Sequence, residues 1–537
     1  MRQKILLVTF LFLLNACGGG SSPTKLPDNG SANLPAEPPS EQPTEEPTEE
    51  PTEEPTEEPV AAPSISQILF STANNSGLPA DLMLSKSSSG TGFNGRVLSN
   101  SRVSGLIASF EFTGSSVSIE GVAQESGTSV NDFTEVVIYT VANSEGETEN
   151  YSVDLAKFTG LPIIYLETDN SAPIESKDDY VTGDVSIDGG RDFDDMPSTE
   201  MKIRGRGNST WFLHPKQPFQ MKLSDKAEFL GMPRDKKWLF LAEYSDKTLL
   251  RNKITFEMGY LSHLDWTPEG RFAEVYINDQ YNGTYNITQK VEESDNRVTL
   301  GDSGYLLELD QLERLDEDDV YFDSVITDRF LINIKEPSLD LDSVEYTYIK
   351  DLLANFETAL YGNSYRSATT GYAKYIDIDS FIDWYLINEI NKNQDSRSWS
   401  SMFVNVMPGE KIKMGPLWDF DLSFGNVDYS DAQYSEGFWV KFHPWFERLF
   451  QDPAFVEKVN VRFAHFKQNQ NSILDKIDAY AEQLQWAQQQ NNDKWQTIGL
   501  AVWPNPVVFD TYQGEVDHLK SWYSNRMEWL ETALAEL

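Results

Sequence analysis

Three aspartates in the second half of the chain have the side chains and the spacing to hold a divalent cation and accept a proton. Asp395 ends the stretch 388–395, which consists mostly of amides and carboxylates. Asp419 and Asp421 lie two residues apart, so on an extended backbone they project to the same face. Mg²⁺ prefers oxygen ligands of this kind, and a remaining carboxylate can take the proton of a hydroxyl nucleophile.

The elements expected around these aspartates can bring them to one end of a sheet. Apolar residues at helical spacing over 381–390 end shortly before Asp395, and 402–407 and 411–414 are typical of a hairpin with its turn at 408–410. Asp419 follows the second strand. The order parallels protein kinases in plan, although the second motif reads Asp-Phe-Asp and no His-Arg-Asp is present. The alternative interpretation is structural, with the three carboxylates capping turns and making hydrogen bonds.

A second candidate site is a basic, glycine-containing stretch at 203–211. Its two glycines let the backbone approach a ligand, and Arg204 and Arg206 can each place a planar fork on phosphate oxygens. Lys216 and Lys222 follow within the next strand-like segment. The stretch is not a Walker loop, because no Gly-Lys-Ser/Thr follows it.

Other chemistries lack the residues that they need. No two of the five histidines lie at metal-ligand spacing, and no Gly-x-Ser-x-Gly motif is present. The net charge of −42 argues against nucleic acid as a partner and against adsorption to anionic lipid. The abundance of aromatic residues, by contrast, can supply a large buried core.

The N-terminus is expected to be a lipoprotein signal peptide over 1–16. A short basic region precedes the apolar run 5–14, which is too short to span a bilayer. The sequence Leu14-Asn15-Ala16-Cys17 resembles a bacterial lipobox, and Cys17 is the only cysteine in the chain. We therefore expect lipidation at Cys17, an extracytoplasmic location on the cell envelope, and contact with the membrane through the lipid anchor only. Gly18 after the cysteine is compatible with the outer membrane.

Three further segments follow the signal peptide. Residues 17–63 contain consecutive Pro-Thr-Glu-Glu units and are expected to form a disordered, extended tether. Residues 64–157 have short β-rich runs and predict a small all-β, immunoglobulin-like sandwich. Within it, 136–141 is apolar almost throughout, as in a strand that is buried on both faces. Residues 158–537 form the remaining domain.

The pattern from 158 onward predicts an α+β domain of two lobes. Strands are expected at 272–277, 281–287, 304–310 and 330–335, with a hairpin turn at 278–280. Helical spacing appears over 349–360 and 381–390, and in the tail over 473–487 and 519–534. Strands come first and helices dominate later, which favours an α+β arrangement.

The chain resembles the CotH (spore coat protein H) kinase family over about 160–430. The resemblance is carried, in the family's order, by 204–211, 215–223, 230–233, 237–238, 246–252, 275–278, 283–285, 304–308, 388–389, 393–395 and 418–421. It implies an atypical bilobal kinase fold that uses ATP and Mg²⁺ or Mn²⁺ to phosphorylate Ser or Thr on a protein acceptor, here unknown.

Position by position, the resemblance assigns roles to single residues. It implies that Asp395 is the catalytic aspartate, that Asp419 binds the metal, and that Asp421 is a second metal ligand. Arg204, Arg206, Lys216 and Lys222 lie in motifs expected near the nucleotide. Gln289 stands where many members carry Glu, and Glu292 or Glu293 could then orient a phosphate-binding lysine.

Two other functions fit the same sequence. The first is a non-catalytic cell-surface scaffold or adhesin with a kinase-like fold, because the tether and the β module suit it equally well. The second is a surface glycan hydrolase, which the tryptophan and tyrosine content would suit. An Asp-x-Asp pair after a strand, however, fits a metal better than a pair of carboxylates separated by a sugar.

Overall fold

The computed structural model describes residues 60–397 and 400–537. The expected signal peptide, Cys17 and the tether up to Pro59 lie outside the described residues. No helix among the described residues is long and apolar enough to cross a membrane.

Residues 64–158 form a β module around a core of their own. One sheet has the strand order β2-β1-β6, a second has the order β3-β4-β11-β10-β7-β8, and β5 pairs with β9. The core contains Phe70, Phe93, Phe133 and Tyr139, all at most 1 % exposed. The strands are β1 (Ser64–Phe70), β2 (Leu82–Met83), β3 (Ser85–Lys86), β4 (Gly92–Leu98), β5 (Ser104–Ile107), β6 (Ser109–Thr113), β7 (Ser116–Ile119), β8 (Val122–Ala123), β9 (Val130–Asp132), β10 (Val137–Ala142) and β11 (Thr148–Phe158).

The prediction that 136–141 is buried on both faces is wrong. In β10 Tyr139 and Val141 point into the core, whereas Ile138 is 44 % exposed. This strand is covered on one face only, so the side chains alternate between core and solvent with the period of two that a strand imposes. The apolar residues on its outer face had hidden that alternation.

A closed barrel of seven strands follows the β module in sequence. Its order is β12-β13-β14-β15-β16-β18-β17, and β12 closes it by pairing with β17 in parallel. Apolar side chains such as Ile203, Met221, Trp238 and Tyr285 fill the interior. The strands are β12 (Ile163–Thr168), β13 (Val181–Asp188), β14 (Met196–Gly205), β15 (Phe219–Phe229), β16 (Met232–Leu241), β17 (Gly270–Ile277) and β18 (Gln280–Gln289).

Local sequence explains the hairpin between β17 and β18. Asn278 and Asp279 both have positive φ, at 49° and 61°, as a two-residue turn between twisted antiparallel strands requires. Asn and Asp tolerate that conformation better than other residues with a side chain. The strand prediction for 272–277, the turn and the strand for 281–287 are therefore confirmed.

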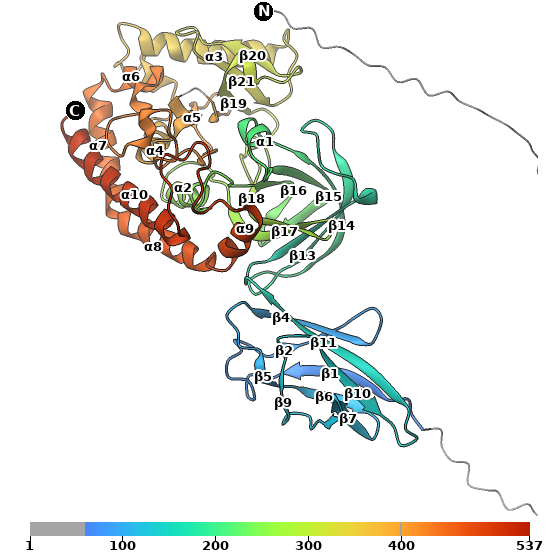
Figure 1. The fold of residues 1–537 in the computed structure, drawn as a ribbon. Helices are drawn as coiled ribbons and strands as arrows, with labels where there is room; N and C mark the ends of the chain where they lie inside the picture. The colour runs from blue at the N-terminus through green and yellow to red at the C-terminus, as the bar shows by residue number, and fades with distance from the viewer. Residues whose placement is uncertain (1–59, 398–399) are drawn as a thin grey trace, which may run out of the picture. The chain divides into compact units, whose positions relative to one another are not determined.

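The C-terminal part combines a five-stranded sheet with most of the helices (Figure 1). The sheet order is β20-β21-β19-β22-β23. Its strands are β19 (Tyr305–Asp310), β20 (Val320–Asp323), β21 (Leu331–Glu336), β22 (Met402–Val406) and β23 (Lys413–Met414). The α-helices are α1 (Ser209–Leu213), α2 (Arg251–Gly259), α3 (Val344–Tyr361), α4 (Ile378–Asn391), α5 (Gln394–Arg397), α6 (Pro444–Leu449), α7 (Pro453–Gln468), α8 (Gln470–Gln483), α9 (Ala487–Trp495) and α10 (Tyr512–Ala535). Short 3₁₀ turns are η1 (Asp169–Ser171), η2 (Leu312–Arg314), η3 (Tyr372–Lys374), η4 (Asp431–Gln433) and η5 (Val440–Phe442).

Helix α4 is the centre of this part and ends where the first candidate aspartate begins. Asp377 caps it by accepting from the Ser380 N–H, and Lys392 ends it in the left-handed conformation. α10 packs against α4, α7 and α8, as Figure 1 shows. A fully buried pair, Arg526 on α10 and Glu389 on α4 at 2.7 Å, joins the two helices. The mixed α+β content agrees with the prediction, but the expected single helical run over 473–487 is broken between α8 and α9.

Candidate functional site

A cleft of about 600 Å³ lies between the barrel and the five-stranded sheet. The glycine-containing stretch after β14 borders it on one side, and the residues around Asp395 and Asp419 border it on the other. Charged side chains dominate its lining. They are Lys177, Asp178, Arg204, Arg206, Lys290, Glu292, Glu308, Asp310, Arg314, Asp316, Asp319, Lys335, Glu336, Asp395, Asp419 and Asp421.

The Asp-Phe-Asp segment is held by hydrogen bonds to its backbone. Asp419 has φ +66°, a left-handed conformation that is strained for a residue with a side chain. Its carbonyl oxygen accepts from Asn393 Nδ2 at 3.1 Å, and the Asp421 carbonyl oxygen accepts from Asn426 Nδ2 at 2.8 Å. The carboxylate of Asp419 accepts from Ser401 Oγ at 3.3 Å. The backbone is thus fixed by side-chain amides, and both carboxylates are left to line the cleft.

Asp395 reaches the same cleft from the short helix α5. The N–H of Gln394 donates to the Leu422 carbonyl oxygen at 3.2 Å, which ties α5 to the residue after Asp421. Burial, followed by the charge of Asp419, raises the pKa of Asp395 to about 7. The same two causes raise the pKa of Asp421 well above its usual range. The structure therefore brings the three predicted aspartates together, close enough that the charge of Asp419 disfavours ionisation of Asp395 and Asp421.

This crowding fits a divalent cation by chemistry. Buried carboxylates that repel one another are stabilised by a bound cation, and carboxylate oxygens are the usual ligands of Mg²⁺ and Mn²⁺. Among residues 60–397 and 400–537, however, no group of three or more His, Cys, Asp or Glu side chains is already arranged around a metal position. Asp419 and Asp421 are the residues that would hold a cation.

Both predicted arginines lie at the cleft. Arg206 stacks over the Trp418 ring at 5.2 Å, and the charges of Asp419, Asp421 and Glu308 oppose the lowering of its pKa by burial. Arg204 stacks on Tyr180 at 4.9 Å and donates to the Asp178 carbonyl oxygen at 3.4 Å. Arg206 therefore faces the carboxylates, while Arg204 lies on the rim.

The two predicted lysines do not line this cleft. Lys216 is 1 % exposed, its Nζ donates to the Thr284 carbonyl oxygen and to Asn491 Oδ1, and it lies over the Tyr285 ring at 4.6 Å. It joins β18 to α9 instead. Lys222 is exposed on β15, between the inward-pointing Met221 and Leu223. A ligand in the cleft would touch neither lysine in this structure.

The cleft has other basic residues that the sequence motifs did not single out. Lys290, directly after β18, and Lys335, on β21, both line it. Lys290 lies 3.7 Å from Glu292, whose carboxylate also pairs with Lys237 at 2.6 Å and with Arg297. Of the two acids suggested to orient a lysine, Glu292 is buried in this cluster and Glu293 is exposed. The sequence could have indicated Lys290, because it directly follows Gln289, the position where many family members carry Glu.

Most of the family-like motif 246–252 has a structural role. Asp246 accepts from the Thr248 and Arg251 N–H groups at the start of α2 and also pairs with the Arg251 guanidinium. Arg251 Nε donates to the Ser423 carbonyl oxygen at 3.0 Å, so α2 supports the segment after Asp421. Trp211 and Trp238 are buried in the barrel core, whereas Trp418 is 9 % exposed and lines the cleft.

Comparison with known proteins gives one family. The family model described as CotH kinase protein matches residues 203–530, which is more than half of the chain. No curated protein matches the chain. A solved structure from Bacteroides thetaiotaomicron, provisionally described as a glycoside hydrolase, is 13 % identical and is matched over 56 % of this chain and 88 % of its own. Its TM-score of 0.15 is too low to support an argument about fold or function.

Proposed function

The chain belongs to the CotH kinase protein family, and from that premise we propose that it is an ATP- and divalent-metal-dependent atypical kinase that phosphorylates Ser or Thr on a protein acceptor. The observation that carries the proposal is the position of Asp395, Asp419 and Asp421 in one cleft, opposite Arg206. The barrel and the helix-rich part are, in this proposal, the two lobes of a kinase-like fold.

The residues of the cleft divide into two tasks. Asp419 and Asp421 would hold Mg²⁺ or Mn²⁺, which when bound neutralises phosphate charge. Arg206 and Lys290 are basic groups available to phosphate oxygens, and Glu292 holds Lys290 in place.

Asp395 has a separate task on the acceptor. It accepts the proton of the acceptor hydroxyl as the new oxygen–phosphorus bond forms and the bond to the nucleoside diphosphate breaks. A pKa raised to about 7 suits a general base near neutral pH.

Calorimetric titration with ATP tests this function first. The full chain is titrated with and without Mg²⁺ or Mn²⁺, beside Asp419→Ala and the control Asp323→Ala, which changes an exposed aspartate on β20. We expect binding that requires the metal, is lost in Asp419→Ala and persists in the control. A folded protein that binds no nucleotide would contradict the proposal and favour the non-catalytic surface scaffold.

We also propose that the enzyme is displayed on the cell envelope. The support is the lipobox-like sequence ending at Cys17 and the Pro-Thr-Glu-Glu units that follow it. In this arrangement the β module lies between the tether and the kinase domain in sequence. We propose that it has an immunoglobulin-like fold and acts as a spacer or adhesion unit.

A further inference from the structure

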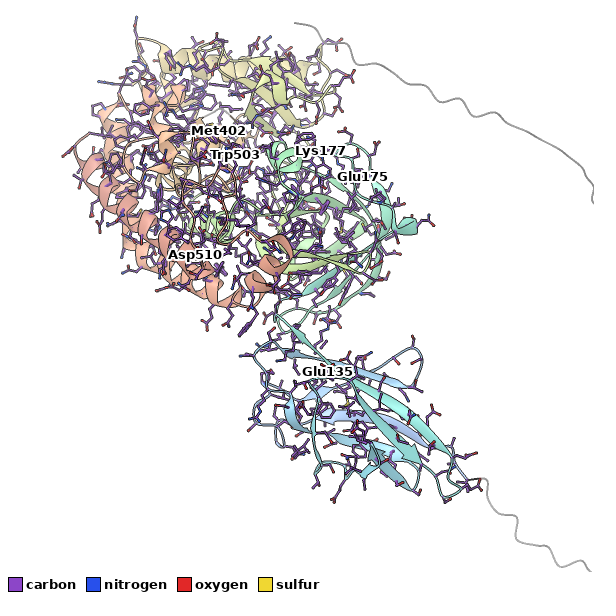
Figure 2. All side chains as sticks on the ribbon, viewed as in Figure 1. Glu135, Glu175, Lys177, Met402, Trp503 and Asp510 are labelled. Atoms are coloured by element: carbon purple, nitrogen blue, oxygen red, sulfur yellow. The ribbon has the colours of Figure 1, made fainter. Side chains whose placement is uncertain are left out.

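Two exposed aromatic side chains stack on one another at the edge of the cleft. The rings of Tyr429 and Trp503 lie 5.8 Å apart with an interplanar angle of 15°, and both side chains line the cleft. They remain 52 % and 51 % exposed. Contiguous exposed apolar side chains mark binding sites for ligands or partners, and Tyr and Trp are enriched at interfaces. Trp503 is labelled in Figure 2.

The pair belongs to the end of the cleft that holds the predicted base. After burial, the charges of Asp395 and Asp421 are the largest causes that raise the pKa of Tyr429, which reaches about 12. For Lys290 the largest charge effects on the pKa, after burial, come from Glu292, Lys237, Glu336 and Lys335. We call the part of the cleft with Tyr429, Trp503 and Asp395 the aromatic end; the charge of Arg314 also acts on Asp395 and Tyr429 there.

A second cavity continues from the aromatic end. It has a volume of about 460 Å³ and shares Trp503 and His214 with the cleft. The rest of its lining is Leu213, Pro215, Tyr244, Ala501 and Val502. Among residues 60–397 and 400–537, no Asp, Glu, Lys or Arg lines this groove, although acidic residues crowd the adjoining cleft. Burial lowers the pKa of His214, so this ring is also uncharged at neutral pH.

The segment that carries Trp503 is anchored to the aspartates. Asn505 Nδ2 donates to Asn426 Oδ1 at 2.7 Å, and Asn426 Nδ2 donates to the Asp421 carbonyl oxygen at 2.8 Å. Asn505 also donates to the Ser245 carbonyl oxygen at 2.7 Å. Two consecutive hydrogen bonds therefore set the position of the groove relative to the predicted site of transfer.

We infer that the Tyr429–Trp503 pair and the apolar groove behind it form the acceptor-binding subsite, which takes a large apolar side chain next to the Ser or Thr that receives the phosphate. The occupant is an extended segment of the acceptor polypeptide, because a chain whose hydroxyl reaches Asp395 passes the aromatic end and meets the groove. An uncharged groove selects an uncharged side chain, since a charge would lose hydration without a partner there. This inference rests on the proposed kinase function.

A peptide array tests the groove without requiring any transfer. Short peptides with alanine in place of the central serine, and with each flanking position scanned through all residue types, are probed with the full chain. We expect Trp, Tyr, Phe or Leu to be enriched at a fixed distance from the centre. Trp503→Ala and Leu213→Arg should remove the enrichment, whereas Trp503→Phe and the control Tyr434→Ala, an exposed tyrosine outside both cavities, should retain it. No enrichment, or an enrichment unchanged in Trp503→Ala, would overturn the inference.

Kinetics on serine-containing versions of the selected peptides test the ligand assignment. Trp503→Ala should raise the KM for the peptide about tenfold, because burial of one large apolar side chain is lost, and should leave the KM for ATP within about twofold. If the KM for ATP rises while that for the peptide does not, the aromatic pair holds the nucleotide base and the inference falls. If peptides are selected through Trp503 but none is phosphorylated, the groove stands as a peptide site and the kinase proposal fails.

Discussion

The backbone N–H of Phe420 donates a hydrogen bond of 2.8 Å to the side-chain oxygen of Asn252, and this bond ties the centre of Asp419-Phe420-Asp421 to α2. The side-chain nitrogen of Asn252, Nδ2, donates to both carboxylate oxygens of Glu243, at 3.1 and 3.2 Å. Asn252 is 3 % exposed, so each partner depends on it rather than on water. One buried side chain at the start of α2 therefore fixes the segment that presents the two predicted metal ligands.

Asn252→Ala should lower the free energy of unfolding by roughly 2–4 kcal/mol. It leaves the buried N–H of Phe420 without its partner, and the buried carboxyl of Glu243 keeps only the longer hydrogen bond of 3.4 Å from Asn286 Nδ2. An unsatisfied buried group costs about 1–3 kcal/mol. Denaturant unfolding followed by circular dichroism measures the change. Asn94→Ala, at an exposed position of β4, is the control and should stay within about 0.5 kcal/mol. A similarly small effect of Asn252→Ala would show that Asn252 does not support the segment.

Asp395→Ala should reduce the rate of phosphoryl transfer by about 10²–10⁴-fold while nucleotide affinity stays within about twofold. The proposed role of Asp395 is on the acceptor hydroxyl, which makes no contribution to nucleotide binding. Single-turnover kinetics and calorimetry on the same preparation separate the two quantities. If affinity and rate fall by the same factor, Asp395 acts in binding and the assignment as base is incorrect.

The matched variants Lys290→Met and Lys222→Met test which of the two lysines binds the nucleotide. Loss of one charge-assisted hydrogen bond to phosphate should weaken ATP binding about tenfold or more in Lys290→Met. Lys222→Met should bind like the unmodified protein, because Lys222 does not line the cleft. The reverse order of affinities would mean that the ligand binds outside this cleft.

Lys216→Met should change how stability depends on pH. Burial lowers the pKa of Lys216 to about 7, against about 10.5 in the unfolded chain. Between these values the unfolded state binds a proton that the folded state does not, so this lysine makes stability rise with pH from about 7 to 10.5. The gain is lost progressively as the pH falls from about 10.5 and is gone at about 7. The slope is at most about 1.4 kcal/mol per pH unit. Urea unfolding of both proteins at pH 7, 8 and 9 should show a difference that grows with pH, and parallel curves would mean that Lys216 titrates normally.

Cys17→Ser should release the protein from membranes, because the lipid is proposed to be the whole of the attachment. Detergent phase partition of cells that express each form measures the effect. The unmodified chain should enter the detergent phase and the variant the aqueous phase. Persistent partition of the variant into detergent would contradict the lipoprotein hypothesis. The sequence alone carries this prediction, since Cys17 lies outside the described residues.

The sequence by itself determined the elements whose signals are local. The helices around 349–360 and 381–390, the turn at Asn278 and Asp279 and the strands beside it could all be predicted, because caps, turn residues and apolar spacing act over a few positions. The same local reasoning placed Asp395 and Asp419 at the two ends of a short hairpin, which was enough to predict that they meet.

Only the tertiary structure decided which basic side chains line the cleft together with Asp395 and Asp419. Lys216 and Lys290 are 74 positions apart, and no local pattern shows that barrel closure buries the first against α9 and turns the second into the cleft. The prediction that Lys222 lies near the nucleotide was wrong for a simpler reason. Its neighbours Met221 and Leu223 occupy the barrel interior, and side chains alternate along a strand, so Lys222 points outward. The pairing of Tyr429 with Trp503 also had no sequence signal, because it depends on loops brought together by long-range packing.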